Sequence, residues 1–76
     1  MKVEIYSTPT CPYCLKAKEY FKENKVEFVE HNVAEDQDRG REMVEKSGQM
    51  GVPVILIGDE VVVGFNKSKI DKALGL

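Results

Sequence analysis

The two cysteines of the chain lie three positions apart, in the segment Cys11-Pro12-Tyr13-Cys14. This segment follows the apolar run Val3-Glu4-Ile5-Tyr6 and precedes a helical pattern, so it marks a junction between a strand and a helix. At a helix start this spacing puts the sulfurs one turn apart, within reach of a disulfide, whose Cα atoms lie about 4.4–6.8 Å apart. So short a ring stabilises a fold by at most about 2 kcal/mol. The pair is therefore interpreted as a reversible thiol–disulfide centre.

Length and composition bound the kind of protein. The chain has 76 residues, of which 42% are hydrophobic and 32% charged, and this predicts one domain over residues 1–76 with one core. A formal net charge of −2 gives no general electrostatic basis for binding nucleic acid. The first residues pass at once into a strand pattern, so neither a signal peptide nor a membrane span is predicted. We expect a cytoplasmic monomer.

Hydrophobic periodicity predicts an α/β protein with the element order β-α-β-α-β-β-α. A strand, a helix and a second strand of these lengths favour a right-handed parallel crossover. The apolar stretch 52–57 reads as a central strand covered on both faces. The predicted strands span 3–6, 26–33, 52–57 and 61–63; the helices span 12 to about 24, about 36–47, and a last segment capped by Asn66 or Ser68.

The predicted helices each carry apolar anchors for the core. Four residues of the first helix repeat at helical spacing: Cys14, Ala17, Tyr20 and Phe21. The second helix has only two strong apolar anchors, Met43 and Val44, and Gly48 is expected to end it. Met43 and Met50 are both interpreted as core or rim residues. The third helix is predicted to carry Ile70, Ala73 and Leu74 inward.

Together these features resemble the glutaredoxins, a family of the thioredoxin fold. The resemblance covers essentially the whole chain and rests on the element order, the Cys-Pro-Tyr-Cys segment, Val52-Pro53 before the third strand, and Gly64 closing the fourth. It implies a four-stranded mixed sheet in the order 2-1-3-4, with helices on both faces, and a disulfide-reducing activity. Most Xaa-Pro bonds are trans, but the resemblance implies a cis bond at Pro53. The Val52 backbone would then be free to pair with an extended peptide or with glutathione.

The residues themselves assign different roles to the two cysteines. Cys11 lies at a helix N-terminus, where unpaired N–H groups and the helix dipole favour a thiolate. Cys14 lies one turn further in and is expected to be more enclosed. We expect Cys11 to attack a substrate disulfide, and Cys14 or glutathione to release the product. The redox-active disulfide would be Cys11–Cys14.

A set of residues is expected to bind the substrate or glutathione around this pair. By resemblance they are Tyr13, Val52, Pro53, Gly64, Phe65 and Asn66, while Pro12 and Lys16 are expected to modulate the site. The chain departs from the family at Thr8, where many glutaredoxins carry a lysine, and at Asn66 and Lys67, where an acidic residue is expected. These departures leave the source of electrons open between glutathione as co-substrate and a reductase enzyme.

Three functions remain open from the sequence. The first is a dithiol oxidoreductase that reduces protein disulfides, glutathione mixed disulfides, or both. The second is a redoxin of the same fold, reduced by a thioredoxin-reductase-type enzyme and donating electrons to ribonucleotide reductase or a peroxidase. The third is an iron–sulfur carrier, against which Pro12 argues by resemblance. No bound cofactor and no metal site are predicted, because His31 stands alone without further cysteines or clustered carboxylates.

Overall fold

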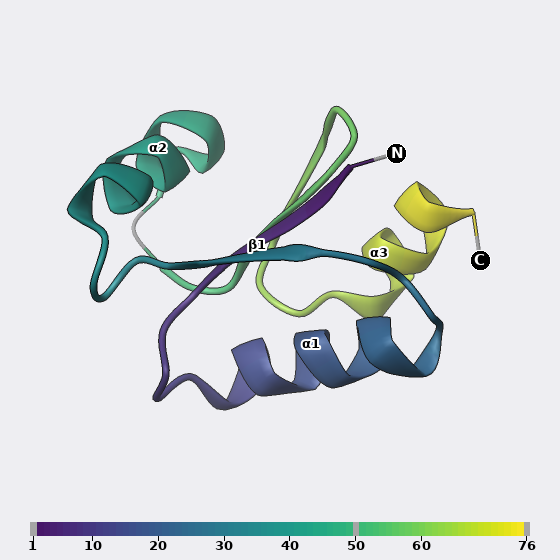
Figure 1. Cartoon of the computed structure of the whole chain (residues 1–76). Helices are drawn as coiled ribbons and strands as arrows, with labels where there is room; N and C mark the ends of the chain where they lie inside the picture. The colour runs from purple at the N-terminus through teal and green to yellow at the C-terminus, as the bar shows by residue number, and fades with distance from the viewer. Residues whose placement is uncertain (1, 50, 76) are drawn as a thin grey trace.

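A computed structural model describes residues 2–49 and 51–75 of the chain. It contains the predicted element order, drawn in Figure 1. The elements are β1 (Val3–Ser7), α1 (Pro12–Glu23), β2 (Val29–Asn32), α2 (Gln37–Ser47), β3 (Val54–Ile57), β4 (Glu60–Val63) and α3 (Lys67–Leu74). No helix among these residues is both long enough and apolar enough to cross a membrane.

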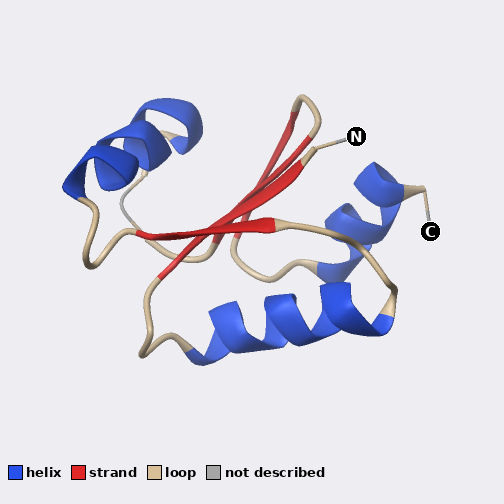
Figure 2. Ribbon diagram, viewed as in Figure 1, coloured by secondary structure: helices blue, strands red, loops and turns tan. Residues whose placement is uncertain are grey.

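The four strands form one mixed sheet in the order β2-β1-β3-β4. Strand β1 runs parallel to β2 and antiparallel to β3, and β3 and β4 form an antiparallel hairpin. Figure 2 shows the twisted sheet with α1 and α3 on one side and α2 on the other. This is the thioredoxin-fold arrangement that the family resemblance implies, so the predicted fold class is confirmed.

The core lies in two layers because alternate residues of each strand point to opposite faces of the sheet. The layer between the sheet and helices α1 and α3 contains Val3, Ile5, Ala17, Phe21, Ile55, Ile57, Val62 and Ile70. The layer beneath α2 is smaller and contains Tyr6, Met43, Val54 and Leu56. The core role predicted for Met43 is confirmed, but Val44 is exposed and is not an anchor. Met50 lies outside the described residues.

Local capping interactions define the helix ends. Asn66 caps α3, because its Oδ1 accepts the Lys69 N–H at 3.2 Å. This decides between the two predicted caps, Asn66 and Ser68. Gly48 ends α2 as predicted, in a left-handed conformation with φ 75° that glycine adopts without steric cost.

Two predicted strands begin too early in the sequence. Pairing of β2 with β1 starts only at Val29, opposite Glu4. Val26 and Phe28 precede this pairing but pack against the α1 and α3 layer, so their apolar alternation reflects burial without a ladder. Likewise β3 starts at Val54, because Pro53 has no N–H to donate to a neighbouring strand.

Candidate active site

Four chain connections meet at one end of the sheet, and three of them carry predicted site residues. The register pairs Tyr6, near the end of β1, with Val54 at the start of β3. Val54 also pairs with Val63 at the end of β4. The connections β1–α1, α2–β3 and β4–α3 therefore converge on the same edge. They carry, respectively, the cysteine pair, the Val-Pro segment and Gly64 through Asn66, so the fold brings together residues that are far apart in sequence.

The Cys11 sulfur lies at the start of α1, at the centre of this convergence. Cys11 is the N-cap residue, and its Sγ accepts the backbone N–H of Cys14 at 3.3 Å. Its sulfur also lies 3.9 Å from the carbonyl oxygen of Val52. The side chain is half-buried and therefore accessible from one side. The donated N–H and the positive end of the helix dipole stabilise negative charge on this sulfur.

The Cys14 sulfur has a contrasting environment, although it is only one helical turn away. Its side chain has no exposed surface. Burial raises the pKa of the Cys14 thiol to about 12, and its hydrogen bond with Cys11 raises it further in the same direction. Cys14 is therefore a protonated thiol at neutral pH. Both residues are free cysteines in this structure.

The segment that faces the cysteines is held in place from β4. The Val52–Pro53 peptide bond is cis, as the family resemblance implies. The Pro53 carbonyl accepts the backbone N–H of Gly64 at 2.8 Å, which joins two of the three connections. Pro53 is buried, whereas Val52 is half-buried. Val52 precedes the first ladder pair of β3, so it takes no part in the strand pairing of the sheet.

The remaining predicted site residues lie around this centre. Tyr13 is 58% exposed, and the Lys16 Nζ lies 5.3 Å from the centroid of its ring. Pro12 is exposed at the first position of α1. Phe65 is half-buried and packs edge-on against Tyr20 of α1, with ring centroids 6.0 Å apart. Phe65 therefore contacts α1 through Tyr20, which the sequence predicts only as a core residue.

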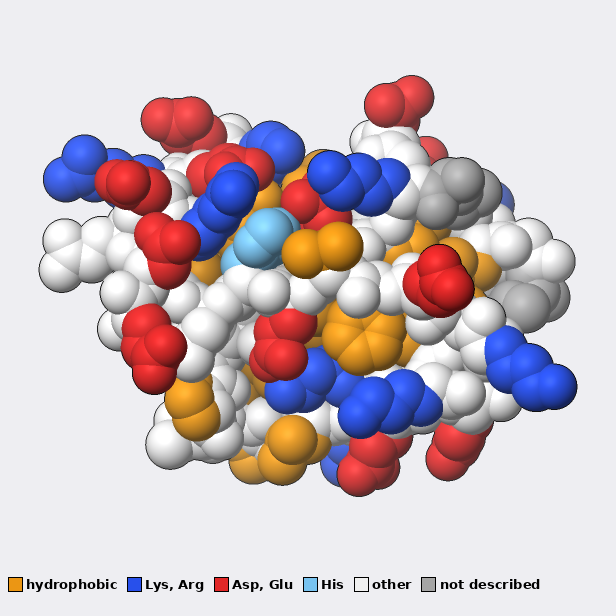
Figure 3. Space-filling model, in the orientation of Figure 1, with side chains coloured by type: hydrophobic (Ala, Val, Ile, Leu, Met, Phe, Trp, Pro, Cys, Tyr) orange, Lys and Arg blue, Asp and Glu red, His pale blue; other side chains and the backbone are white. Residues whose placement is uncertain are grey.

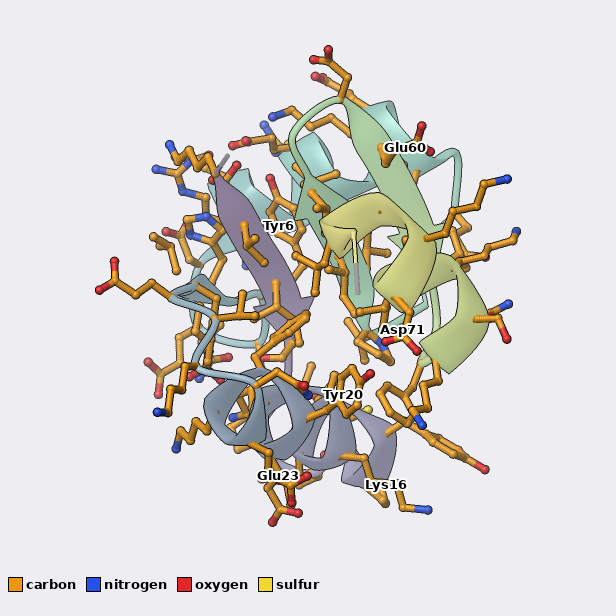
Figure 4. The ribbon with its side chains drawn as sticks, turned by 90° about the vertical axis from the view of Figure 1, so that its right-hand side faces the viewer. Tyr6, Lys16, Tyr20, Glu23, Glu60 and Asp71 are labelled. Atoms are coloured by element: carbon orange, nitrogen blue, oxygen red, sulfur yellow. The ribbon has the colours of Figure 1, made fainter. Side chains whose placement is uncertain are left out.

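Two polar clusters near the site were missed by the sequence analysis. In the first, the Tyr20 hydroxyl donates to Asp71 Oδ1, and Figure 4 shows Tyr20 directed from α1 toward Asp71 on α3. In the second, Glu30 accepts from Lys18 Nζ at 2.7 Å and from the Ser7 hydroxyl at 2.8 Å. These bonds lower the pKa of the Glu30 carboxyl, with Lys18 the larger cause. The partners lie on different elements, so no local spacing in the sequence could have indicated them.

No metal-binding cluster occurs within residues 2–49 and 51–75, where no group of three or more His, Cys, Asp or Glu side chains could hold an ion. His31 instead contacts Glu4, with 2.9 Å between Nε2 and Oε1. The His31 ring also packs on Tyr6, with centroids 5.0 Å apart. The site described here is therefore built from two thiols, backbone groups and aromatic rings.

Comparison with known proteins gives consistent results. The glutaredoxin family profile matches residues 3–62. A glutaredoxin-like 8.6 kDa protein in the rubredoxin operon of Clostridium pasteurianum is 53% identical over 72 residues, which cover 95% of this chain and 96% of that protein.

Two solved structures extend the comparison to the fold. The T8A mutant of the thioredoxin-like protein BC3987 superposes with a TM-score of 0.92 and 32% identity, covering 97% of this chain and 95% of that one. NrdH-redoxin from Escherichia coli, described as a glutaredoxin-like protein with a thioredoxin-like activity profile, gives a TM-score of 0.84 and 25% identity. That match covers 95% of this chain and 93% of the other. The profile match and the identity over nearly the whole chain show that this protein, a redox protein of the thioredoxin fold, belongs to the glutaredoxin family.

Proposed function

We propose that the protein is a dithiol thiol–disulfide oxidoreductase with Cys11 as nucleophile and Cys14 as resolving thiol. The observation that carries this proposal is the difference between the two sulfurs. Cys11 is accessible and accepts an N–H bond, whereas Cys14 is buried, with a pKa of about 12. A nucleophile must reach its substrate as a thiolate, whereas a resolving thiol needs to react only after the substrate has been captured.

The proposed cycle transfers two electrons. The Cys11 thiolate attacks one sulfur of a substrate disulfide, the S–S bond breaks, and the departing thiolate takes a proton from solvent. Cys14 then loses its proton and attacks the Cys11 sulfur of the mixed disulfide. This second step releases the other substrate thiol and forms the Cys11–Cys14 disulfide. The substrate is reduced to two thiols, and the two cysteines are oxidised.

The segment at Val52 is proposed to hold the substrate during this exchange. Its backbone lies beside the Cys11 sulfur and outside the β3 ladder, so it can pair with an extended peptide or with the peptide-like backbone of glutathione. Tyr13, Gly64, Phe65 and Asn66 would border the bound substrate, and Pro12 would modulate the cysteine pair. Pro53 shapes the segment from its buried position.

A test of the cysteine roles uses single substitutions. Cys11→Ser should abolish reduction of every disulfide substrate. Cys14→Ser should abolish reduction of protein disulfides and retain reduction of glutathione mixed disulfides, where glutathione itself can resolve the intermediate. The readout is NADPH consumption in a coupled assay, with intact mass spectrometry to trap the mixed disulfide on Cys14→Ser. Substantial activity of Cys11→Ser, or a disulfide trapped on Cys14, would reverse the assignment.

A second candidate is a redoxin that receives electrons from a thioredoxin-reductase-type enzyme. Thr8 and Lys67 stand where many glutaredoxins carry a cation and an acid for glutathione, and the Asn66 side chain caps α3. The structural similarity to NrdH-redoxin, described as thioredoxin-like in activity, supports the same reading. As such a redoxin, the protein would donate electrons to ribonucleotide reductase or a peroxidase.

The source of electrons can be tested directly. The oxidised protein is incubated with NADPH and either glutathione plus glutathione reductase or thioredoxin reductase, and the return of free thiols is followed. Reduction by the first system alone identifies glutathione as co-substrate, and reduction by the second alone identifies a redoxin. For either role we propose a single-domain monomer in the cytoplasm, a compartment that keeps cysteine thiols reduced.

A further inference from the structure

The three connections that form the active site differ in charge from the rest of the chain. Residues 7–16, 47–53 and 63–68 contain two lysines, Lys16 and Lys67, and no Asp or Glu, although the whole chain has a formal net charge of −2. Figure 3 shows dense red and blue over α2 at the upper left, and mainly white and orange at the lower left, where the start of α1 lies. These three connections therefore carry net positive charge on an acidic protein, whereas the β2–α2 connection, which follows the outermost strand at the same edge of the sheet, carries Glu35 and Asp36.

The two lysines lie on different helices, each next to a connection that carries predicted site residues. Lys16 projects from α1, and its Nζ lies over the ring of Tyr13. Tyr13 is one of the two residues between the cysteines in the sequence. Figure 4 shows Lys16 on the outer side of α1. Lys67 is the first residue of α3, three positions after Gly64, which is bonded to Pro53. Its Nζ lies 5.7 Å from the centroid of the Tyr20 ring. Neither lysine forms a salt bridge with any described carboxylate.

Two carboxylates on elements next to these connections already have partners. Glu30 is paired with Lys18 at 2.7 Å, and Asp71 accepts from the Tyr20 hydroxyl. Lys67 also occupies a position that helix stability disfavours, because a cation at a helix N-terminus opposes the helix dipole. The N-terminus of α2, which follows the outermost strand β2 at the same edge of the sheet, instead carries Asp36 as its cap and Asp38 in its first turn.

We infer that this active site prefers protein disulfides flanked by acidic residues, with Lys16 and Lys67 as the residues that set the preference. The inference rests on the proposed oxidoreductase function and names its substrate class. An extended segment paired with the Val52 backbone would lie near the starts of α1 and α3, so carboxylates that flank its disulfide would come within reach of these cations. Charges at the rim of an interface act mainly on association rate and are screened by salt.

The test uses three synthetic peptides with the same internal disulfide, flanked by glutamate, glutamine or lysine residues. The reduced protein is mixed with each peptide in a stopped-flow instrument, and the second-order rate of peptide reduction is measured. We expect the acidic peptide to react about tenfold faster than the basic one at about 20 mM ionic strength, falling to about twofold at about 500 mM.

The variant Lys16→Gln/Lys67→Gln isolates the two lysines from the intrinsic reactivity of the peptides. It should reduce the acidic-to-basic ratio to below about threefold at low salt. The control variant Lys22→Gln/Lys72→Gln changes the net charge equally, from the last turns of the same two helices, and should keep the tenfold ratio.

Each other outcome has a distinct meaning. Equal rates for the acidic and basic peptides, or a ratio that survives in Lys16→Gln/Lys67→Gln, would overturn the acidic preference and leave the proposed function intact. Loss of glutathione mixed-disulfide reduction in that variant, with unchanged peptide ratios, would also overturn it, because the lysines would then serve glutathione. Failure to reduce even the glutamine peptide would overturn the oxidoreductase function itself.

Discussion

At the scale of single residues, position alone makes two identical side chains different. Cys11 and Cys14 are three residues apart, yet one sulfur caps a helix and the other has no exposed surface. Burial is the larger cause of the raised pKa of Cys14, so its thiol stays protonated across the physiological range. The chemical asymmetry of the pair is thus a consequence of where α1 begins.

This asymmetry predicts selective alkylation. With a pKa of about 12, only about one Cys14 in 100,000 is a thiolate at pH 7, so its reaction with iodoacetamide should be at least about a hundredfold slower than that of Cys11. Peptide mapping of the reduced protein after timed alkylation measures both rates. In the Cys11→Ser variant no alkyl group on Cys11 can block access to Cys14, so this variant is the control for that effect. Comparable rates at the two cysteines would contradict the buried, protonated state of Cys14.

Gly64 provides a second prediction at the residue scale. Its φ of 78° lies in the left-handed region, where a Cβ is unfavourable by about 1–2 kcal/mol. Space is not the obstacle, since a Cβ there would meet no atom within 4 Å. Gly64→Ala should therefore lower the free energy of unfolding by about 1–2 kcal/mol, measured by urea denaturation.

Gly51→Ala is the matched control for Gly64→Ala. Gly51 also belongs to the active-site end, but its φ lies outside the left-handed region and its Cβ would make only an ordinary contact of 3.5 Å with Gln49. This substitution should be neutral or stabilising by up to about 1 kcal/mol. Equal destabilisation by both substitutions would show that crowding, and not backbone conformation, explains the effect.

At the scale of elements, the sequence predicts what depends on local patterns. The order of all seven elements, the Gly48 helix end and the buried face of α1 follow from spacing and capping chemistry. The start of β2 does not follow from such patterns. Val26 and Phe28 are apolar because they pack against the layer of α1 and α3, and they take no part in the strand pairing. The position of Cys11 at a helix start is enough to predict that the site is centred on this residue. The contacts of Tyr20 with Asp71 and of Ser7 with Glu30 could not be predicted, since they join separate elements.

The contact between β1 and α2 predicts a pH dependence of stability. The Tyr6 hydroxyl donates to Glu42 Oε1 at 2.8 Å, and this bond, followed by those with Lys46 and Arg39, lowers the pKa of Glu42 from 4.5 to about 2. A carboxyl whose pKa is lower in the folded state stabilises the fold above about pH 4.5. That stabilisation is lost as the pH falls toward about 2.

Substitution of Glu42 tests this sign. Glu42→Gln should lower the urea midpoint clearly at pH 7 and much less at pH 2.5, where the native carboxyl is already partly protonated. Glu45→Gln changes the same charge on the exposed side of the same helix and should have little effect at either pH. A Glu42→Gln effect that is equal at both pH values would contradict the role of the ionised carboxylate.

At the scale of the whole molecule, the sheet joins two unequal core layers. Along β3, Ile55 and Ile57 face α1 and α3, whereas Val54 and Leu56 face α2. The α2 face is less completely covered, and Val61 and Val63 of β4 remain 40% and 44% exposed. Because the same four residues of β3 serve both layers, neither layer can lose its packing while β3 stays unchanged. The two layers should therefore unfold as one unit.

Ile70 in α3 tests this coupling because it is fully buried in the larger layer and lies far in sequence from α2. Ile70→Val removes one methyl-sized group and should lower the free energy of unfolding by about 0.5–1.5 kcal/mol. Native-state hydrogen exchange then reports the loss element by element. If the layers unfold together, the slowest amides of β3 and of α2, around Met43, should lose protection by the same free energy as those of α3. A loss confined to α3 and α1, with α2 unchanged, would instead show that the α2 layer is an independent unit and that the shared strand does not couple the two cores.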